Sequence, residues 1–217
     1  MAAVQGAVAG ALINTGQDCT AATRAYVQRP LYDAFVAGVA DLMGTVVLGH
    51  PLDGRTDQGP LVSRAQQERV AGFVDRARGD GAKVVRGGVA PGGALARGAY
   101  YEPTLVVGAA QASEIVQHEV FGPVLTIQRF GTEDEGVALA NDTTYGLSAI
   151  VYTGDPARAE RVSSALVAGT VWVNSFFVRD LRAPFGGSRN SGIGREGGFW
   201  SFDFYSDVKN VCMAPWE

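Results

Sequence analysis

The stretch NTGQDCTAATRAYVQRPLYDAFVAGV, residues 14–39, decides the fold. Its residues 24–28 alternate apolar and polar side chains, which is typical of a strand. Pro30 follows, in the first turn of a pattern whose apolar residues recur at helical spacing as far as Val39. A strand that leads directly into a helix is the building unit of an α/β sheet.

The rest of the chain repeats this alternation. Helices are expected over residues 2–13, 63–79, 132–141 and 156–167, and strands over 83–86, 101–107, 124–130, 147–152 and 170–174. The alternation predicts an α/β fold with a mostly parallel sheet and helical crossovers. A final segment, Phe202 to Met213, alternates along one face and predicts an edge strand that awaits a partner.

Composition excludes several classes of protein. The 217 residues are 47% hydrophobic and 18% charged, which is typical of a globular chain with a sizeable core. A net charge of -4 offers no basic surface for nucleic acid. The apolar run 2–13 is too short to span a bilayer. Cys19 and Cys212 do not form a disulfide framework, so we expect a reducing cytoplasm, and we predict no metal site.

Cys19 lies on a short glycine-bearing turn between two apolar runs. Such a cysteine is either a small core residue or a nucleophile. Free cysteine is among the most buried residue types, so composition alone favours the core.

Three motifs, which follow one another along the chain, favour the nucleophile over the core residue as the interpretation of Cys19. They are residues 12–24 around Cys19, EVFGP at 119–123, and PFGG at 184–187 followed by SGIGRE at 191–196. Together they resemble the catalytic half of the NAD(P)-dependent aldehyde dehydrogenases, and the resemblance covers essentially the whole chain.

The resemblance implies a role for each motif. Cys19 would be the nucleophile that attacks the aldehyde, and its main-chain N–H would form part of the oxyanion site. Glu119 would hold the nicotinamide ribose hydroxyls, and Phe121 would pack near the nicotinamide. Phe185 would line the substrate tunnel. Without the family, Glu119 would be interpreted as a solvated turn acid and Phe185 as a core residue.

The segment RDLRAPF, residues 179–185, resembles the hydroxymuconic and aminomuconic semialdehyde dehydrogenases. Arginine suits a carboxylated substrate because its guanidinium forms bidentate, charge-assisted hydrogen bonds. Arg179 is the first candidate and Arg182 the second, against the alternative of solvated loop arginines. The turn GQDCTAATR also resembles aminoaldehyde and betaine aldehyde enzymes.

Several parts of the family's site are not found in these residues. The family's base is a glutamate in a Glu-Leu-Gly-Gly stretch, and neither Glu102 nor Glu114 has that context. His50 and His118 make no strong case for a Cys-His pair, and His118 stands where the family often has a second acid. The upstream asparagine of the oxyanion site and the N-terminal Rossmann domain are also missing.

The resemblance therefore implies that residues 1–200 are an aldehyde dehydrogenase catalytic domain without its Rossmann domain, and 201–217 an oligomerisation strand and tail. The expected activity is oxidation of an aldehyde, foremost an acidic semialdehyde, with NAD or NADP. The chain would form a homo-oligomer or join a partner chain that supplies the Rossmann half, and we expect it to bind little NAD alone. Two alternatives stay open: a non-catalytic assembly module that pairs with full-length relatives, and a residual cysteine esterase.

Overall fold

The fold is built on a four-stranded sheet, and the computed structural model describes residues 1–216. The strands lie in the order β1 (Arg24–Gln28), β4 (Val124–Phe130), β3 (Thr104–Val107) and β2 (Lys83–Arg86). β4 is parallel to both β1 and β3, whereas β2 is antiparallel to β3. A second sheet pairs β5 (Ser148–Val151) and β6 (Thr170–Val173) in parallel. The predicted α/β fold with mostly parallel strands is confirmed.

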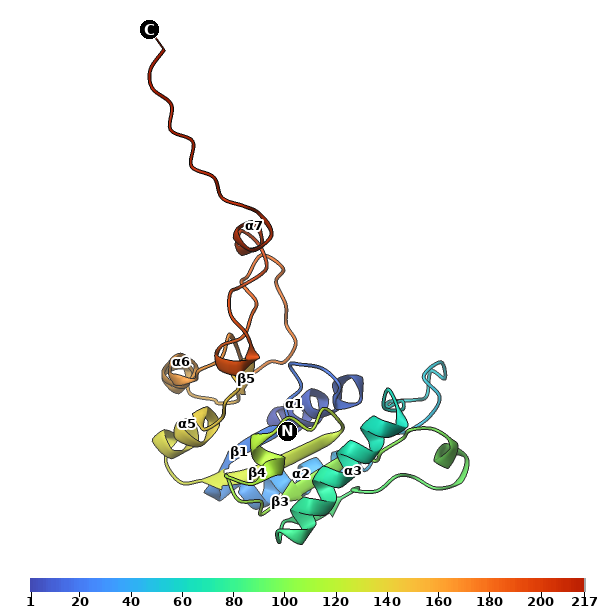
Figure 1. Ribbon diagram of the computed structural model, residues 1–217. Coiled ribbons are helices and arrows are strands. Elements are labelled where there is room, and N and C mark those ends of the chain that lie inside the picture. The colour runs from blue at the N-terminus through green and yellow to red at the C-terminus, as the bar shows by residue number, and fades with distance from the viewer. Residues whose placement is uncertain (217) are drawn as a thin grey trace.

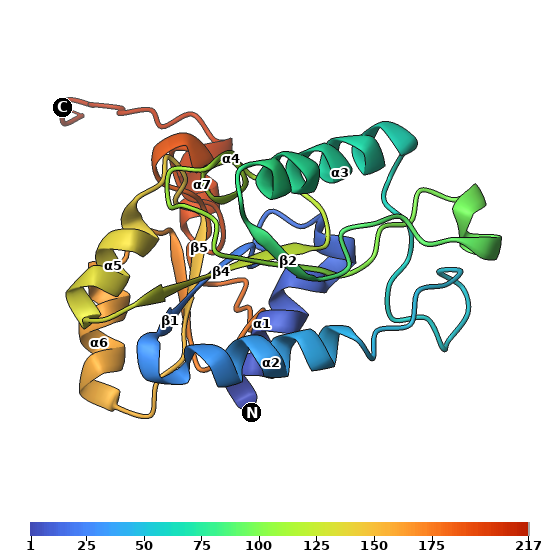
Figure 2. The same ribbon diagram turned by 90° about the horizontal axis from the view of Figure 1, so that it is seen from below.

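Helices cover both faces of the larger sheet (Figures 1 and 2). α1 (Ala2–Leu12) and α2 (Tyr32–Met43) pack together on one face, and α3 (Arg64–Gly79) lies on the other. α6 (Pro156–Ala165) packs against the smaller sheet, and α5 (Glu133–Asn141) lies between α6 and the β1 and β4 strands of the larger sheet. The shorter helices are η1 (Ile13–Gly16), η2 (Arg29–Leu31), η3 (Gly93–Arg97), α4 (Glu114–Gln117), η4 (Arg189–Ser191) and α7 (Trp200–Tyr205).

Local capping explains where three of the helices begin. Ser63 Oγ accepts a hydrogen bond from the Gln66 N–H at 3.1 Å, as the sequence predicts for this helix start. Thr132 caps α5 in the same way, and Asp155 caps α6 immediately before its first-turn proline.

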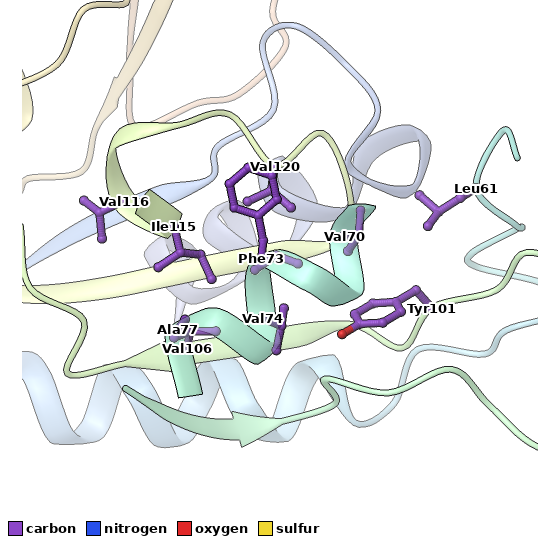
Figure 3. Packing of buried hydrophobic residues seen from close by; sticks show 11 residues of the cluster. Leu61, Val70, Phe73, Val74, Ala77, Tyr101, Val106, Ile115, Val116 and Val120 are labelled. Carbon is purple, nitrogen blue, oxygen red and sulfur yellow. The ribbon is translucent and has the colours of Figure 1, made fainter. Parts of the chain in front are cut away.

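Two apolar clusters bury the two faces of the larger sheet. The α3 side holds Phe73, Val74, Tyr101, Val106 and Val124 with their neighbours (Figure 3). The opposite side joins α1 and α2 to β1, β3 and β4 through Ala11, Val39, Met43, Leu105, Leu125 and Ile127. Strands buried on both faces are near-continuous apolar runs, as in β3 and β4.

The edge strand predicted over 202–213, which awaits a partner, is not formed within the single chain. α7 occupies residues 200–205, and residues 206–216 pair with no other strand among the described residues. Two-residue alternation becomes a strand only when a neighbouring strand accepts its hydrogen bonds. The segment instead projects from the body of the chain as an exposed tail (Figure 1).

Two strands begin later than predicted. β3 starts at Thr104, because Pro103 precedes it and has no N–H for a ladder. β5 starts at Ser148 rather than at residue 147. Only Val151 of this strand is fully buried, and the other three residues are partly exposed. None of the helices described for residues 1–216 is both long and apolar enough to cross a membrane.

Candidate active site

The turn before Cys19 has an unusual backbone that its neighbours hold in place. Asn14, Thr15 and Gly16 have φ values of 47°, 59° and 71°, in the left-handed region. A non-glycine residue there costs about 1 to 3 kcal/mol, so surrounding contacts must fix it. The hydroxyl of Thr15 donates to Gly59 O at 3.3 Å, and Gln17 Oε1 accepts from the Val62 N–H at 2.9 Å. The turn is therefore a constrained element rather than a free loop.

Cys19 lies at the exposed side of this turn. Asp18 Oδ1 accepts from the Thr20 N–H at 2.7 Å and from the Thr20 hydroxyl at 2.5 Å. Thr20 is buried, whereas Cys19 is exposed and free. The core interpretation of Cys19 is wrong, because its neighbour occupies the buried position and the thiol remains accessible.

The surroundings of the Cys19 thiol raise its pKa. Partial burial of the sulfur is the main cause, although the residue as a whole is exposed, and the Asp18 carboxylate adds to it. The main-chain N–H of Cys19 and the Arg179 guanidinium act in the opposite direction, and Glu119 again raises the pKa. Because the thiolate is the nucleophilic form, this cysteine needs a base or a bound cation to react rapidly.

The EVFGP loop lies directly against the cysteine turn. A Cβ added to Gly16 would come within 2.0 Å of Gly122 O, so the two backbones touch. Phe121, between Glu119 and Gly122, has a left-handed φ of 57°. The structure thus brings together two motifs that lie a hundred residues apart in the sequence.

Glu119 is half-buried, which argues against a solvated turn acid. Burial raises its pKa, and the nearby Arg69 guanidinium acts to lower it. α3 supports this loop through Gln66 and Arg69, which donate hydrogen bonds to its main-chain oxygens. Neither residue was predicted from the sequence. Their spacing of three on a helix was the only signal, and nothing in the sequence shows which loop they meet.

Arg179 and Arg182 have different environments. The guanidinium of Arg179 lies 4.3 Å from the centre of the Phe177 ring and 5.4 Å from that of Phe185. Arg182 instead forms an ion pair with Asp180 at 2.8 Å, with 89% of its side chain exposed. Arg179 is also close enough to lower the pKa of Cys19. The structure therefore gathers Cys19, Glu119, Arg179 and Phe185 in one region and leaves Arg182 with a partner of its own.

Other ionisable residues take no part in this arrangement. Glu114 is engaged by Arg76 at 2.6 Å, and His50 and His118 are exposed on the surface. Across residues 1–216, no group of three His, Cys, Asp or Glu side chains is placed to hold a metal ion.

Comparison with known proteins places the chain in a family. Residues 1–211 match the aldehyde dehydrogenase family, and the chain belongs to it. It is 44% identical over 213 residues to 2-hydroxymuconic semialdehyde dehydrogenase of Pseudomonas putida, a match that covers 97% of this chain and 44% of the relative. It is 40% identical to 2-aminomuconic 6-semialdehyde dehydrogenase of a Pseudomonas species, over 97% of this chain and 43% of that relative.

Solved structures agree with this assignment. Betaine aldehyde dehydrogenase of Staphylococcus aureus in complex with NAD⁺ superposes with a TM-score of 0.92 at 38% identity, covering 94% of this chain and 41% of that one. The NAD⁺ complex of an aldehyde dehydrogenase from Bacillus cereus gives 0.93 at 37% identity, covering 97% and 42%. The chain thus spans less than half the length of the relatives it matches.

Proposed function

We propose that this chain supplies the catalytic part of an NAD(P)-dependent aldehyde dehydrogenase, with residues 1–200 as the catalytic domain and 201–217 as a tail for assembly. One observation carries the proposal. The accessible Cys19 lies on a constrained turn whose backbone touches the loop that carries Glu119. The names of the relatives support the same reaction.

In the proposed mechanism, the Cys19 thiolate attacks the aldehyde carbon to give a thiohemiacetal, whose oxyanion the main-chain N–H of Cys19 would help to stabilise. A bound nicotinamide would accept the hydride that leaves this carbon. The resulting thioester of Cys19 is then cleaved by water, which releases the carboxylic acid and restores the thiol. Thus Cys19 takes up and releases the acyl group once in each turnover.

The residues fit the nicotinamide end of the cofactor. A half-buried carboxylate at Glu119 can accept hydrogen bonds from two ribose hydroxyls, and Phe121, two residues further on, would pack near the nicotinamide. The NAD⁺ complexes of two relatives support NAD. The family resemblance places the adenine and phosphates on a Rossmann domain, which we propose lies in a part of the complete enzyme outside residues 1–216. We therefore expect calorimetric titration of the chain alone to detect little NAD binding; micromolar affinity would contradict this expectation.

The general base would come from another part of the complete enzyme. The raised pKa of Cys19 favours a mechanism in which such a base takes the thiol proton. Glu114 is held by Arg76, and Glu102, which lies just before β3, is not among the charges that shift the pKa of Cys19. The relatives' greater length leaves room for a base outside the matched region.

The proposed substrate is an acidic semialdehyde. Arg179, close to both Cys19 and Phe185, would bind its carboxylate, with Arg182 as a second and weaker contact. The names of the two Pseudomonas relatives support this substrate class. With it we propose a role in the breakdown of aromatic compounds. Free Cys19 and Cys212 suit a reducing cytoplasm, which we propose as the location.

A second candidate function is a non-catalytic assembly module. The tail and α7 expose large apolar side chains, with Phe199 84%, Val208 86% and Trp216 90% exposed. Such a surface is typical of an assembly interface. Deletion of residues 202–217 should reduce the oligomer size in light-scattering measurements, and an unchanged size would count against this role.

The activity can be tested in a chimaera that joins the part of the P. putida relative preceding the match to this chain. We expect it to reduce NAD when an aldehyde is added. Cys19→Ala should abolish the reaction and Cys212→Ser should leave it intact. Equal rates of activated-ester hydrolysis by the parent chain and its Cys19→Ala variant would exclude the cysteine esterase alternative. A chimaera whose aldehyde oxidation survives Cys19→Ala would contradict the proposed function.

A further inference from the structure

Three successive main-chain oxygens of the loop that carries Glu119 accept hydrogen bonds from α3. Arg69 donates through Nη2 to Glu119 O at 2.8 Å and through Nη1 to Val120 O. Gln66 donates through Nε2 to Phe121 O at 2.8 Å and to Val120 O at 3.3 Å. The two donors are three residues apart, so they share one face of the helix.

The loop depends on these contacts for its shape. Phe121 adopts a left-handed φ of 57°, which costs about 1 to 2 kcal/mol for a residue with a side chain. At Gly122 an added Cβ would lie 2.5 Å from Val70 Cγ2, so α3 also approaches the loop too closely for a side chain. The backbone path from Glu119 to Gly122 is therefore set by the surface of α3.

Arg69 is itself fixed by its surroundings. Its guanidinium carbon lies 4.8 Å from the centre of the Phe73 ring, which holds the cation over an aromatic face. The same charge acts on the Glu119 carboxylate and opposes the effect of burial on it. Arg69 therefore influences both the position and the charge of Glu119.

We propose that Arg69 and Gln66 are positioning residues for Glu119, and through it for the nicotinamide ribose. The inference rests on the proposed function, in which Glu119 accepts the ribose hydroxyls. Hydride transfer requires a narrow range of geometry, so a shift of about 1 Å in this carboxylate would reduce the rate strongly. α3 thus acts on the reaction through the loop rather than through contact with the reacting atoms.

The alternative is that Arg69 only stabilises the fold, and the chain contains a matched control for it. Arg76 belongs to the same helix, and its guanidinium carbon lies 5.1 Å from the centre of the same Phe73 ring. It pairs with Glu114 at 2.6 Å and donates no hydrogen bond to the Glu119 loop. Arg76→Gln therefore removes the same charge and a similar ring contact while it leaves the loop untouched.

The first experiment follows the carboxyl carbon of Glu119 by NMR during a pH titration of the chain, with Glu119→Gln to assign the signal. Arg69→Gln should raise the titration midpoint by about half a pH unit or more, and Arg69→Lys by less because it keeps the charge. Arg76→Gln should leave the midpoint in place. If Arg69→Gln has no effect, or if Arg76→Gln has an equal one, the inference is overturned.

The second experiment measures NAD kinetics in the chimaera. Arg69→Gln and Gln66→Ala should raise the KM for NAD roughly fivefold or more while the KM for the aldehyde changes less than about twofold, and Arg69→Lys should restore part of the loss. Equal increases of both KM values would indicate a structural role and overturn the inference. An inactive parent chimaera would count against the proposed function alone, and the NMR titration would still decide the role of Arg69.

Discussion

Gly16 and Gly122 lie in backbone contact: a Cβ at Gly16 would approach Gly122 O to 2.0 Å. This contact joins the turn of the proposed nucleophile to the loop of the proposed ribose ligand. No side chain can be placed between the two segments. The two segments can approach this closely only because position 16 is a glycine, which has no side chain.

Gly16→Ala should be strongly destabilising. The new methyl group would clash with the main chain, and φ at this position is +71°. We expect the free energy of unfolding to fall by about 2 kcal/mol or more in urea denaturation. Gly54→Ala is the control, because nothing lies within 4 Å of its Cβ position, and should stay within about 0.5 kcal/mol. Equal stability of the two variants would contradict the contact.

The pH dependence of Cys19 alkylation should follow the charges around the thiol. Asp18 raises the pKa of Cys19 after the main effect of burial, and Arg179 lowers it. In a Cys212→Ser background, Asp18→Asn should shift the midpoint of iodoacetamide labelling to lower pH, because it removes the negative charge that raises the pKa of Cys19. The neutral amide oxygen can still accept the two hydrogen bonds from Thr20, so the turn should keep its shape. Arg179→Gln should shift it to higher pH. Shifts of the opposite sign would show that other groups control the thiol.

Arg179 and Arg182 should differ in their effect on substrate. In the chimaera, Arg179→Ala should raise the KM for a carboxylated semialdehyde roughly tenfold, the loss expected for a charged hydrogen bond. The KM for a neutral aldehyde should change less than about twofold. Arg182→Ala should have a smaller effect, because Asp180 already binds that guanidinium at 2.8 Å. Equal effects of Arg179→Ala on both aldehydes would refute the assignment.

Glu119 should contribute a pH dependence to stability. Burial raises its folded pKa above the ordinary value of 4.5, so the folded chain binds this proton more tightly than the unfolded chain. The stability it contributes is fully present below the unfolded pKa and is lost as the pH rises through the folded pKa. Relative to the parent, Glu119→Gln should therefore gain stability as the pH rises from about 4 to about 7.

Glu114→Gln provides a control of opposite sign for this measurement. The ion pair with Arg76 lowers the pKa of Glu114, so its contribution is present above the unfolded pKa and lost as the pH falls. Urea denaturation at a series of pH values checks both variants. A Glu119→Gln difference that does not vary with pH would indicate that the carboxylate is solvated.

The sequence predicted the elements whose signals are local. Ser63 marks the start of α3, and the apolar runs of β2 and β4 have the predicted bounds. The strand predicted over 202–213 stays a prediction: alternation shows only that a strand is possible, a ladder depends on a partner strand, and in the single chain residues 200–205 are helical.

The site was predictable only as separate motifs. Cys19, Glu119 and Phe185 can be found by resemblance, but their arrangement depends on contacts between distant segments. The support of the Glu119 loop by Gln66 and Arg69 joins residues at least 50 positions apart. The ion pair between Arg182 and Asp180 is local, yet a sequence cannot show whether such an arginine pairs with a neighbouring carboxylate or binds a substrate.

The central claim, that Cys19 carries the acyl group, is tested most directly by mass spectrometry of the chimaera after rapid acid quenching during turnover. We predict that the peptide containing Cys19 gains the mass of the acyl group of the added aldehyde, that this adduct requires NAD, and that it disappears in Cys19→Ser. An acyl group on Cys212, or turnover without any adduct on Cys19, would contradict the account.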